Sequence, residues 1–352
     1  MTFRRTLIRA VLAAGLGAAL APAALAQQPV AQKPVTLKFH TFMAPQSNVW
    51  LSMHTPWMDK VEKESGGRIR FERYPAMQLG GTARDLFDQV RDGVVDVIWT
   101  LPGYTPGRFP RIEVFELPFM MTNAEATSRA YWEYVQTYAR DEFKDVHLIA
   151  VNVHGPGVLH MRDRQVRSVE DLKGLKMRGP SRFVTRMLGA LGATPVGMPL
   201  PQIPDALSKG VINGAVIPWE VVPSVKVNEL ARYHAEFAPE AGALYTATFV
   251  MAMNRKKYES LPPELKKVID DNSGMATSAW LGKTQQGNDP KGRQSAETPR
   301  NTIYTLSSET AAAFRTAAAD VADEWVREMN GKGHDGQALL DAAKALIDRH
   351  TP

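Results

Sequence analysis

The chain has 352 residues, with 42 lysines and arginines against 37 aspartates and glutamates, and it has no cysteine. Disulfides, thiolate zinc sites and cysteine nucleophiles are therefore excluded. Without the three arginines of the first nine residues, 39 basic side chains balance 37 acidic ones, and nucleic-acid-binding surfaces show a clustered and larger basic excess. We expect no nucleic-acid partner.

The first 26 residues have the pattern of an export signal. Three arginines precede an alanine-rich apolar run, and the sequence "ALA" at 24–26 has the small-x-small pattern of a signal-peptidase site. The run is short and dilute for a membrane-spanning helix of about 20 residues, which makes a membrane anchor the weaker alternative. We expect cleavage near Ala26 and a mature protein in the periplasm.

The mature chain begins with alternating strand and helix patterns. Apolar Val35, Leu37 and Phe39 alternate with polar neighbours, and three helically spaced residues follow before a Gly-Gly stop. This order predicts a parallel sheet with helices on its faces. The expected strands are 35–40, 68–74 and 94–100, and the expected helices are 50–67 and 82–93.

The same alternation resumes in the second half of the chain. We expect strands at 146–153, 172–178 and 212–217 and a helix at 181–192. Segment 172–178 reads as a short edge strand that ends in a turn. An apolar run at 243–254 is long enough to pass through a sheet or between two sheets.

The last hundred residues read as mainly helical. Segment 262–286 predicts one long helix beginning at two prolines, and 307–329 predicts another amphipathic helix. The polar stretch 287–301 between them reads as a loop.

Length and pattern together predict an α/β protein of two domains. The expected boundaries are 1–26 for the signal peptide, 27–153 plus about 243–285 for domain I, and 154–242 plus about 286–352 for domain II. Crossing strands and a long connecting helix would join the two lobes. Open α/β sheets bind ligands at the carboxyl ends of their strands, so the sequence predicts a ligand-binding cleft.

Seven segments resemble a known family in order and spacing. The chain resembles the periplasmic solute-binding proteins of TRAP transporters, of the C4-dicarboxylate-binding type. This resemblance implies the two-lobed periplasmic binding protein fold, an organic acid as ligand, and delivery to the membrane permease subunits of a sodium-driven transporter. The segments are "GGRIRFERYPAMQLGG", "VRDGVVDV", "GRFPRIEVFELPF", "SVEDLKGLKMRGP", "GATPVGMP", "ALSKGVINGAVIPW" and "MNRKKYESLPPELKKVI".

Arg178 occupies the position at which the family pairs an arginine with the substrate carboxylate. A guanidinium offers parallel N–H donors that match two carboxylate oxygens, and it keeps its charge when buried. The alternative is a solvated arginine at a strand end.

Departures from the family indicate what the ligand is not. Phe42, Leu101 and Ile217 stand where the sialic-acid-binding branch has polar residues, and Val158 stands where that branch has a second arginine. Sugar hydroxyls left unpaired against such walls would cost about 1–3 kcal/mol each. We therefore expect a small or aromatic monocarboxylate, including 2-oxo and 2-hydroxy acids, in preference to a sugar acid or a long dicarboxylate.

Four further residues are candidates because they follow predicted strands. Trp219 could stack on the ligand or pack at the hinge, and His40, Trp99 and Tyr104 lie at carboxyl ends of strands or in the loops after them.

Two more candidates come from turns near Arg178 and from an apparent histidine pair. Ser181 could donate to the ligand carboxylate or cap the next helix. His160 could face the cleft, but its six-residue spacing from His154 matches no zinc signature. We predict no metal and no cofactor.

An enzyme is the least favoured alternative. The sequence lacks G-x-S-x-G, helix-opening G-x-G-x-x-G, H-E-x-x-H and P-loop motifs, and we predict no catalytic residue. A ligand-sensing partner of a membrane receptor would use the same cleft and remains an alternative.

Overall fold

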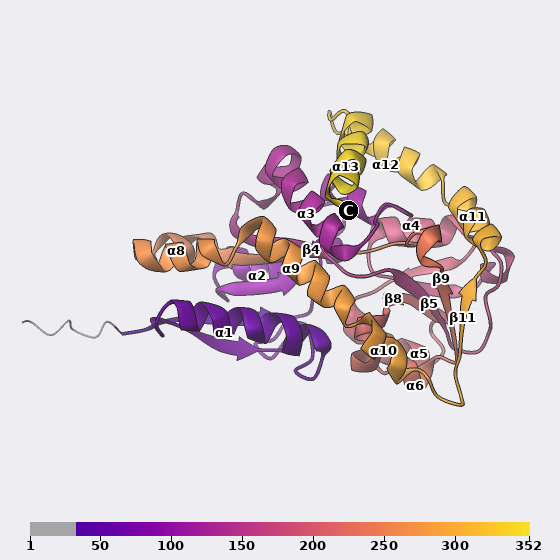
Figure 1. The fold of residues 1–352 in the computed structure, drawn as a ribbon, viewed down its shortest axis with the longest axis horizontal. Helices are drawn as coiled ribbons and strands as arrows, with labels where there is room; N and C mark the ends of the chain where they lie inside the picture. Colours follow the sequence, from indigo (N-terminus) through magenta and orange to yellow (C-terminus); the bar gives the residue numbers. More distant parts are fainter. Residues whose placement is uncertain (1–32) are drawn as a thin grey trace, which may run out of the picture. The chain divides into compact units, whose positions relative to one another are not determined.

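The computed structural model describes residues 33–352, and Pro34–Pro352 form one compact unit built on two mixed sheets (Figure 1). The expected signal peptide lies outside the described residues. Within the described part, no helix combines the length and the apolar character needed to cross a membrane.

The first sheet is mixed, with one strand running against the others. Strand β1 pairs in parallel with β2 and β3, whereas β10 is antiparallel to both of its neighbours. Leu37 and Phe39 of β1 are fully buried and Lys38 between them is exposed, as the alternation predicts. The spatial order is β2 (Ile69–Tyr74), β1 (Val35–Thr41), β3 (Val97–Thr100), β10 (Thr248–Asn254) and β4 (Val146–Val153).

The second sheet has six strands and is also mixed, with one strand antiparallel to both of its neighbours. Here β5 is the strand antiparallel to both of its neighbours, β8 and β9. The spatial order is β11 (Thr302–Leu306), β9 (Tyr233–Phe237), β5 (Gly157–Met161), β8 (Gly214–Pro218), β6 (Lys176–Gly179) and β7 (Thr194–Gly197).

The expectation of an edge strand at 172–178 is wrong. Strand β6 lies between β8 and β7, and it pairs in parallel with both. The edge belongs to β7, which contains Pro195, and proline is tolerated at an edge because it has no N–H to donate to a further strand. Arg178 is therefore on an interior strand, with neighbours on both sides.

The chain passes between the two sheets three times. It leaves the first sheet after β4 and enters the second at β5, returns from β9 to β10, and reaches β11 by way of α9 and α10. The antiparallel strands β5 and β10 each follow a crossing, whereas β11, which follows the third, is parallel to β9. The crossing strands expected near 152 and 243–251 are thus present.

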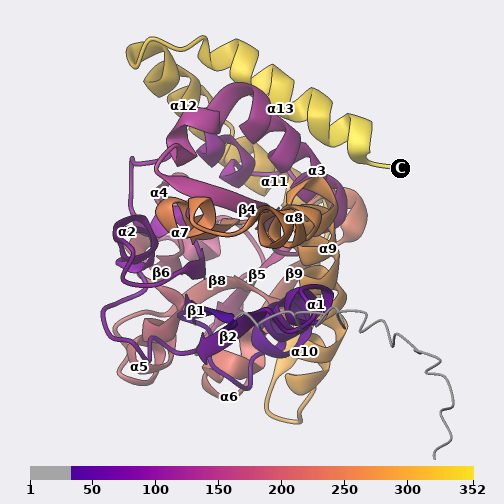
Figure 2. The same cartoon turned by 90° about the vertical axis from the view of Figure 1, so that its left-hand side faces the viewer.

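The helices cover both sheets. Helix α3 packs against α9 and β4, and α13 packs against α3, as both views show (Figures 1 and 2). The α-helices are α1 (Thr55–Glu64), α2 (Leu86–Asp92), α3 (Ala124–Tyr134), α4 (Arg182–Ala190), α5 (Ile203–Ser208), α6 (Val227–Leu230), α7 (Arg255–Glu259), α8 (Pro263–Asp271), α9 (Gly274–Gly287), α10 (Asp289–Ser295), α11 (Ser308–Ala317), α12 (Asp320–Gly331) and α13 (Gly336–His350). Short 3-10 helices include η2 (Pro102–Tyr104), η3 (Ile112–Glu116) and η8 (Trp219–Val225), and η1 (Trp50–His54) is a short π-helix.

The single helix expected over 262–286 is two helices, α8 and α9. Ser273 between them is extended, with φ −124° and ψ 178°, and Gly274 has φ +88°, a conformation that glycine adopts without strain. The indole nitrogen of Trp57 donates to the Asn272 carbonyl at 2.9 Å, which satisfies an acceptor that the end of α8 exposes.

The polar loop expected over 287–301 contains a helix, α10. This helix packs against η8, and a Cβ on Gly292 would lie 2.0 Å from the Trp219 carbonyl oxygen. The close approach of two backbones explains why a sequence that is polar throughout is ordered here. The amphipathic segment 307–329 is likewise divided, into α11 and α12, at Ala318 and Ala319.

Candidate functional site

A small cavity lies where the carboxyl ends of strands from both sheets meet. Residues after β1 and β3 form one side, and residues at the ends of β6 and β8 form the other. Segments that cross between the sheets complete it. Aliphatic side chains of the lining include Met43, Val49, Leu101, Leu200, Ile217 and Val221.

Aromatic rings form a wall of the cavity. Trp99 stacks on Phe249 with the ring centroids 4.2 Å apart and an interplanar angle of 11°. Phe42 lies 5.7 Å from Trp99 at 29°, and its edge contacts Tyr104 at 5.5 Å. Because the rings are offset or stacked on one another, their positions are fixed by mutual packing, and the cavity has a rigid aromatic side.

Arg178 supplies the positive charge of the cavity. Its side chain is 2 % exposed, and backbone carbonyls hold it: Nε donates to Met198 at 2.9 Å and Nη1 to Val216 at 3.2 Å. A guanidinium has five N–H donors, so the backbone carbonyls leave three, one on Nη1 and two on Nη2, and the Tyr104 hydroxyl lies close to this group. The two Nη atoms are thus the pair available for an end-on bidentate contact with a carboxylate.

No carboxylate of residues 33–352 forms an ion pair with Arg178, although other partly buried arginines are paired. Arg182, for example, contacts Glu113 and Glu328. Burial lowers the pKa of Arg178, and the nearby hydroxyls of Tyr104 and Tyr245 oppose this effect. Arginine remains charged in proteins despite such shifts, so the cavity presents an uncompensated cation that favours an anion.

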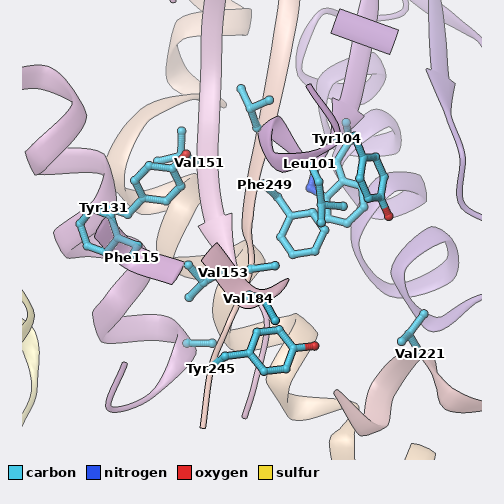
Figure 3. Close-up of a cluster of buried hydrophobic side chains, with 14 of the residues drawn as sticks. Leu101, Tyr104, Phe115, Tyr131, Val151, Val153, Val184, Val221, Tyr245 and Phe249 are labelled. Atoms are coloured by element: carbon cyan, nitrogen blue, oxygen red, sulfur yellow. The ribbon is translucent and has the colours of Figure 1, made fainter. Parts of the chain in front are cut away.

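The two tyrosines flank the guanidinium from the side of the first sheet. The hydroxyl of Tyr104 accepts a hydrogen bond from the Leu200 backbone N–H at 3.0 Å, which links the loop after β3 to the turn after β7. Figure 3 shows Tyr104, Leu101 and Phe249 together, with Tyr245 and Val221 on other sides of the same space. Tyr245 lies directly over Gly157, where a Cβ would come 1.9 Å from its ring.

A second polar group of the cavity, Glu220, lies at the start of η8. Its Oε1 accepts a hydrogen bond from Gln285 at 2.8 Å, while its Oε2 is buried without a partner among the described residues. Burial, reinforced by the charge of Asp289, raises the pKa of Glu220 to about 8 against the opposing bond from Gln285. Burial therefore favours the neutral, protonated form of this carboxyl group at neutral pH.

His154 also lines the cavity. Its Nδ1 lies 2.5 Å from the Gly155 carbonyl oxygen, a contact in which the ring nitrogen must donate. Burial and, to a smaller extent, the charge of Arg178 lower the pKa of His154 to about 4. The ring is neutral at physiological pH and leaves Arg178 as the charged group of the lining.

Six of the ten expected site residues line this cavity: Arg178, Phe42, Trp99, Leu101, Tyr104 and Ile217. The other four do not. His40 contacts Gln89 at 2.9 Å, and Ser181 lies at the start of α4 with its buried hydroxyl unpaired within the described residues.

His160 and Trp219 belong to a separate buried cluster with His234, outside the cavity lining. The Nδ1 atoms of His160 and His234 are 2.7 Å apart, and His160 Nε2 lies 3.2 Å from the Ile217 carbonyl oxygen. The Trp219 indole donates to Glu236 at 2.7 Å and lies edge-on to His160. Val158 of β5 pairs with Ile217 of β8, and it does not line the cavity.

Several lining residues were not foreseen, chiefly Tyr245, Phe249, Glu220, Gln285 and His154. His154, Tyr245 and Gln285 lie in segments that cross between the sheets, Phe249 lies within β10, and Glu220 follows the end of β8 in η8. The two glycines of "HGPG" could have indicated close packing at this point, because Gly157 makes room for Tyr245 and a Cβ on Gly155 would collide with Asp289.

Comparison with known proteins agrees with this geometry. Residues 39–328 match the family described as bacterial extracellular solute-binding protein, family 7. The chain belongs to this family. The resemblance to TRAP solute-binding proteins that the sequence motifs indicated is therefore confirmed, as is the two-lobed α/β fold.

Solved structures of family 7 proteins provide more specific similarities. The chain is 67% identical to a TRAP solute-binding protein from Rhodoferax ferrireducens T118 in complex with copurified benzoate, over 90% of this chain and 98% of that one, with a TM-score of 0.89. It is 47% identical to a marine metagenome TRAP solute-binding protein specific for aromatic acid ligands, in complex with 3-hydroxybenzoate (91% and 100% covered, TM-score 0.89). A protein from Bordetella bronchiseptica with bound mandelate is 28% identical (90% and 100% covered, TM-score 0.82).

Proposed function

We propose that this family 7 protein captures an aromatic monocarboxylate, with benzoate as the reference ligand, and delivers it to the membrane permease of a TRAP transporter. The observation that carries the proposal is Arg178, a buried cation without an acidic partner within residues 33–352, at the edge of an aromatic-walled cavity. The 67% identical relative with copurified benzoate supports it.

The contacts suggest how such an acid binds. The carboxylate accepts paired hydrogen bonds from Nη1 and Nη2 of Arg178, while backbone carbonyls hold the guanidinium in place. The ring packs against the wall of Phe42, Trp99 and Phe249, where stacked or edge-on contacts add to simple burial.

The lining disfavours other classes of acid. The second carboxylate of a dicarboxylate would need a second cation, and Arg178 is the one lysine or arginine that lines the cavity in the described part of the chain. The many hydroxyls of a sugar acid would meet Leu101, Ile217 and aromatic faces and remain unpaired.

The arrangement gives no support to an enzyme. Glu220 is hydrogen-bonded to Gln285 and not to His154. The Thr246 hydroxyl lies 3.3 Å from His154 Nδ1, but it donates to the His154 carbonyl at 2.8 Å, and Nδ1 donates its own proton to the Gly155 carbonyl, so this nitrogen is no base for the hydroxyl. A receptor-linked sensor would use the same cavity, and no particular contact favours it.

We propose that residues 1–26 direct export and are removed; mass spectrometry of the periplasmic protein should find a terminus at Gln27.

The decisive experiment is a thermal-shift screen of the mature protein, followed by calorimetry. The ligands are benzoate, mandelate, a 2-oxo acid, succinate and gluconate, all at the same pH and ionic strength. We expect the aromatic monocarboxylates to raise the melting temperature most and to bind most tightly. Stronger binding of succinate or gluconate would refute the proposal.

A further inference from the structure

Glu220 ends a chain of hydrogen bonds that runs through four buried side chains. The indole Nε1 of Trp99 donates to Oδ1 of Asn152 at 3.1 Å, and Nδ2 of Asn152 donates to Oε1 of Gln285 at 2.8 Å. Nε2 of Gln285 then donates to Oε1 of Glu220 at 2.8 Å. The chain connects the aromatic wall to the start of η8.

The direction of this chain is fixed at the tryptophan. An indole N–H can only donate, so the Asn152 atom facing it must be the oxygen and the Asn152 nitrogen must face Gln285. The same reasoning places the Gln285 oxygen towards Asn152 and its nitrogen towards Glu220. Glu220 Oε1 therefore acts as an acceptor, and any proton on this carboxyl group resides on Oε2.

Oε2 of Glu220 has no hydrogen-bond partner among residues 33–352, although the residue is 2 % exposed and lines the cavity. The titratable groups facing it from neighbouring elements are Asp289 of α10 and Tyr245. No lysine or arginine of the described part pairs with it, so the Gln285 hydrogen bond to Oε1 is the one contact that favours the ionised form, and burial outweighs it. A buried group of this kind that finds no partner within the protein is available to a ligand.

We propose that Glu220 is a neutral hydrogen-bond donor that recognises an oxygen substituent on the ligand's ring, so that the preferred ligands are hydroxylated aromatic acids. The inference rests on the proposed function, since it presumes an aromatic acid bound at Arg178. It adds a second polar subsite to the cavity, made by η8 and α9 and separate from the carboxylate site on β6.

The test compares four ligands by calorimetry at pH 6.5: benzoate, 3-hydroxybenzoate, 4-hydroxybenzoate and 3-aminobenzoate. We expect one hydroxybenzoate to bind the parent protein about five- to ten-fold more tightly than benzoate, the value of one hydrogen bond. We expect it also to exceed aminobenzoate, because an aniline nitrogen is a poor acceptor. An ionised Glu220 would instead accept from both substituents.

Two variants test the role of the side chain. Glu220→Gln keeps an acceptor for Gln285 and an N–H donor for the ligand, so the hydroxybenzoate-to-benzoate affinity ratio should persist. In Glu220→Met the ratio should fall to about one. Glu229→Gln, at an exposed position of α6, is the control that should leave every affinity unchanged.

The outcomes separate the two proposals. If benzoate binds but the hydroxybenzoates gain nothing, or aminobenzoate binds best, the role of Glu220 is overturned and the proposed function stands. If no aromatic acid binds the parent protein, both are overturned. The ligand comparison uses only the parent protein, so it decides the question even if a Glu220 variant does not fold.

Discussion

Arg178 differs from the partly buried arginines Arg182 and Arg111 in what holds it. Arg182 pairs with Glu113 and Glu328, and Arg111 with Asp141 and Glu142, so their charges are neutralised internally. Arg178 is instead oriented by two backbone carbonyls, which accept hydrogen bonds without cancelling its charge. A residue fixed in this way is preorganised for an anion that arrives from outside.

Replacement of Arg178 should therefore weaken benzoate binding severely. Loss of a buried charge partner costs about 2–5 kcal/mol, or about thirty-fold to several thousand-fold in affinity. Arg178→Lys should be nearly as weak as Arg178→Ala, because an ammonium cannot reproduce the planar pair of donors. Calorimetry on folded variants measures this, with exposed Arg327→Ala as control. Binding by Arg178→Ala within threefold of the parent would rule out the assigned role.

Glu220 should make the protein less stable as the pH rises. Its folded-state pKa of about 8 lies above the ordinary value of 4.5, so between these values the folded state holds a proton that the unfolded chain has released. This contribution is fully present below pH 4.5 and is lost as the pH rises through about 8. Urea unfolding from pH 5 to 9 should show a stability decline that is less steep in Glu220→Gln, by up to about 1.4 kcal/mol per pH unit. Parallel curves would contradict the assignment.

Among secondary-structure elements, the start of β5 shows how a backbone shapes the cavity. Gly157 leaves space that the ring of Tyr245 occupies, with hypothetical Cβ distances of 1.9, 2.3 and 2.8 Å to its atoms. Gly157 does not have a positive φ. A glycine is therefore needed here because a side chain would collide with Tyr245, and not because the backbone conformation requires one.

Gly157→Ala should displace Tyr245 from the cavity wall. We expect a loss of about 1–3 kcal/mol in stability, as for other overpacked sites, together with weaker benzoate binding. Gly189→Ala is the matched control: this exposed residue of α4 has only Pro195 near its hypothetical Cβ, at 3.9 Å, and alanine should stabilise the helix by about 0.5–1 kcal/mol. Thermal unfolding and calorimetry of both variants decide the matter.

The elements that the sequence predicted are those with a regular apolar pattern. Strands β1, β2, β3 and β4 lie where alternation or buried runs placed them. The end of β3 carries lining residues that the strand-end rule predicted, whereas Arg178 of β6 and Ile217 of β8 were predicted from the family resemblance. The break before α9 depends on one positive φ at Gly274, and α10 depends on contact with η8. Neither leaves a periodic trace in the sequence. Tyr245 was not predicted because its place is set by the crossing from β9 to β10, and Glu220 was not predicted because its place depends on contacts with Gln285 and Asp289.

At the scale of the whole molecule, we expect the two lobes to move together when a ligand binds. The cavity lies between loops of both sheets, and the Tyr104 to Leu200 and Asn48 to Glu220 hydrogen bonds connect them across it. Hinge closure is a common response in this architecture. Solution X-ray scattering should show a smaller radius of gyration with saturating benzoate, and Arg178→Ala should not respond. An unchanged radius in the parent protein would argue against closure.

The three crossings between the sheets also determine how the protein can be divided. Strand β10 (Thr248–Asn254) lies between β3 (Val97–Thr100) and β4 (Val146–Val153) but comes much later in the chain than either, so a fragment ending at residue 153 would lack the strand that joins its own sheet. The same holds for the second sheet, whose edge strand β11 arrives only after α9 and α10. Neither lobe is therefore encoded by a continuous stretch of the gene. A single cut between residues 153 and 248 would therefore separate strands that pair with each other in the first sheet.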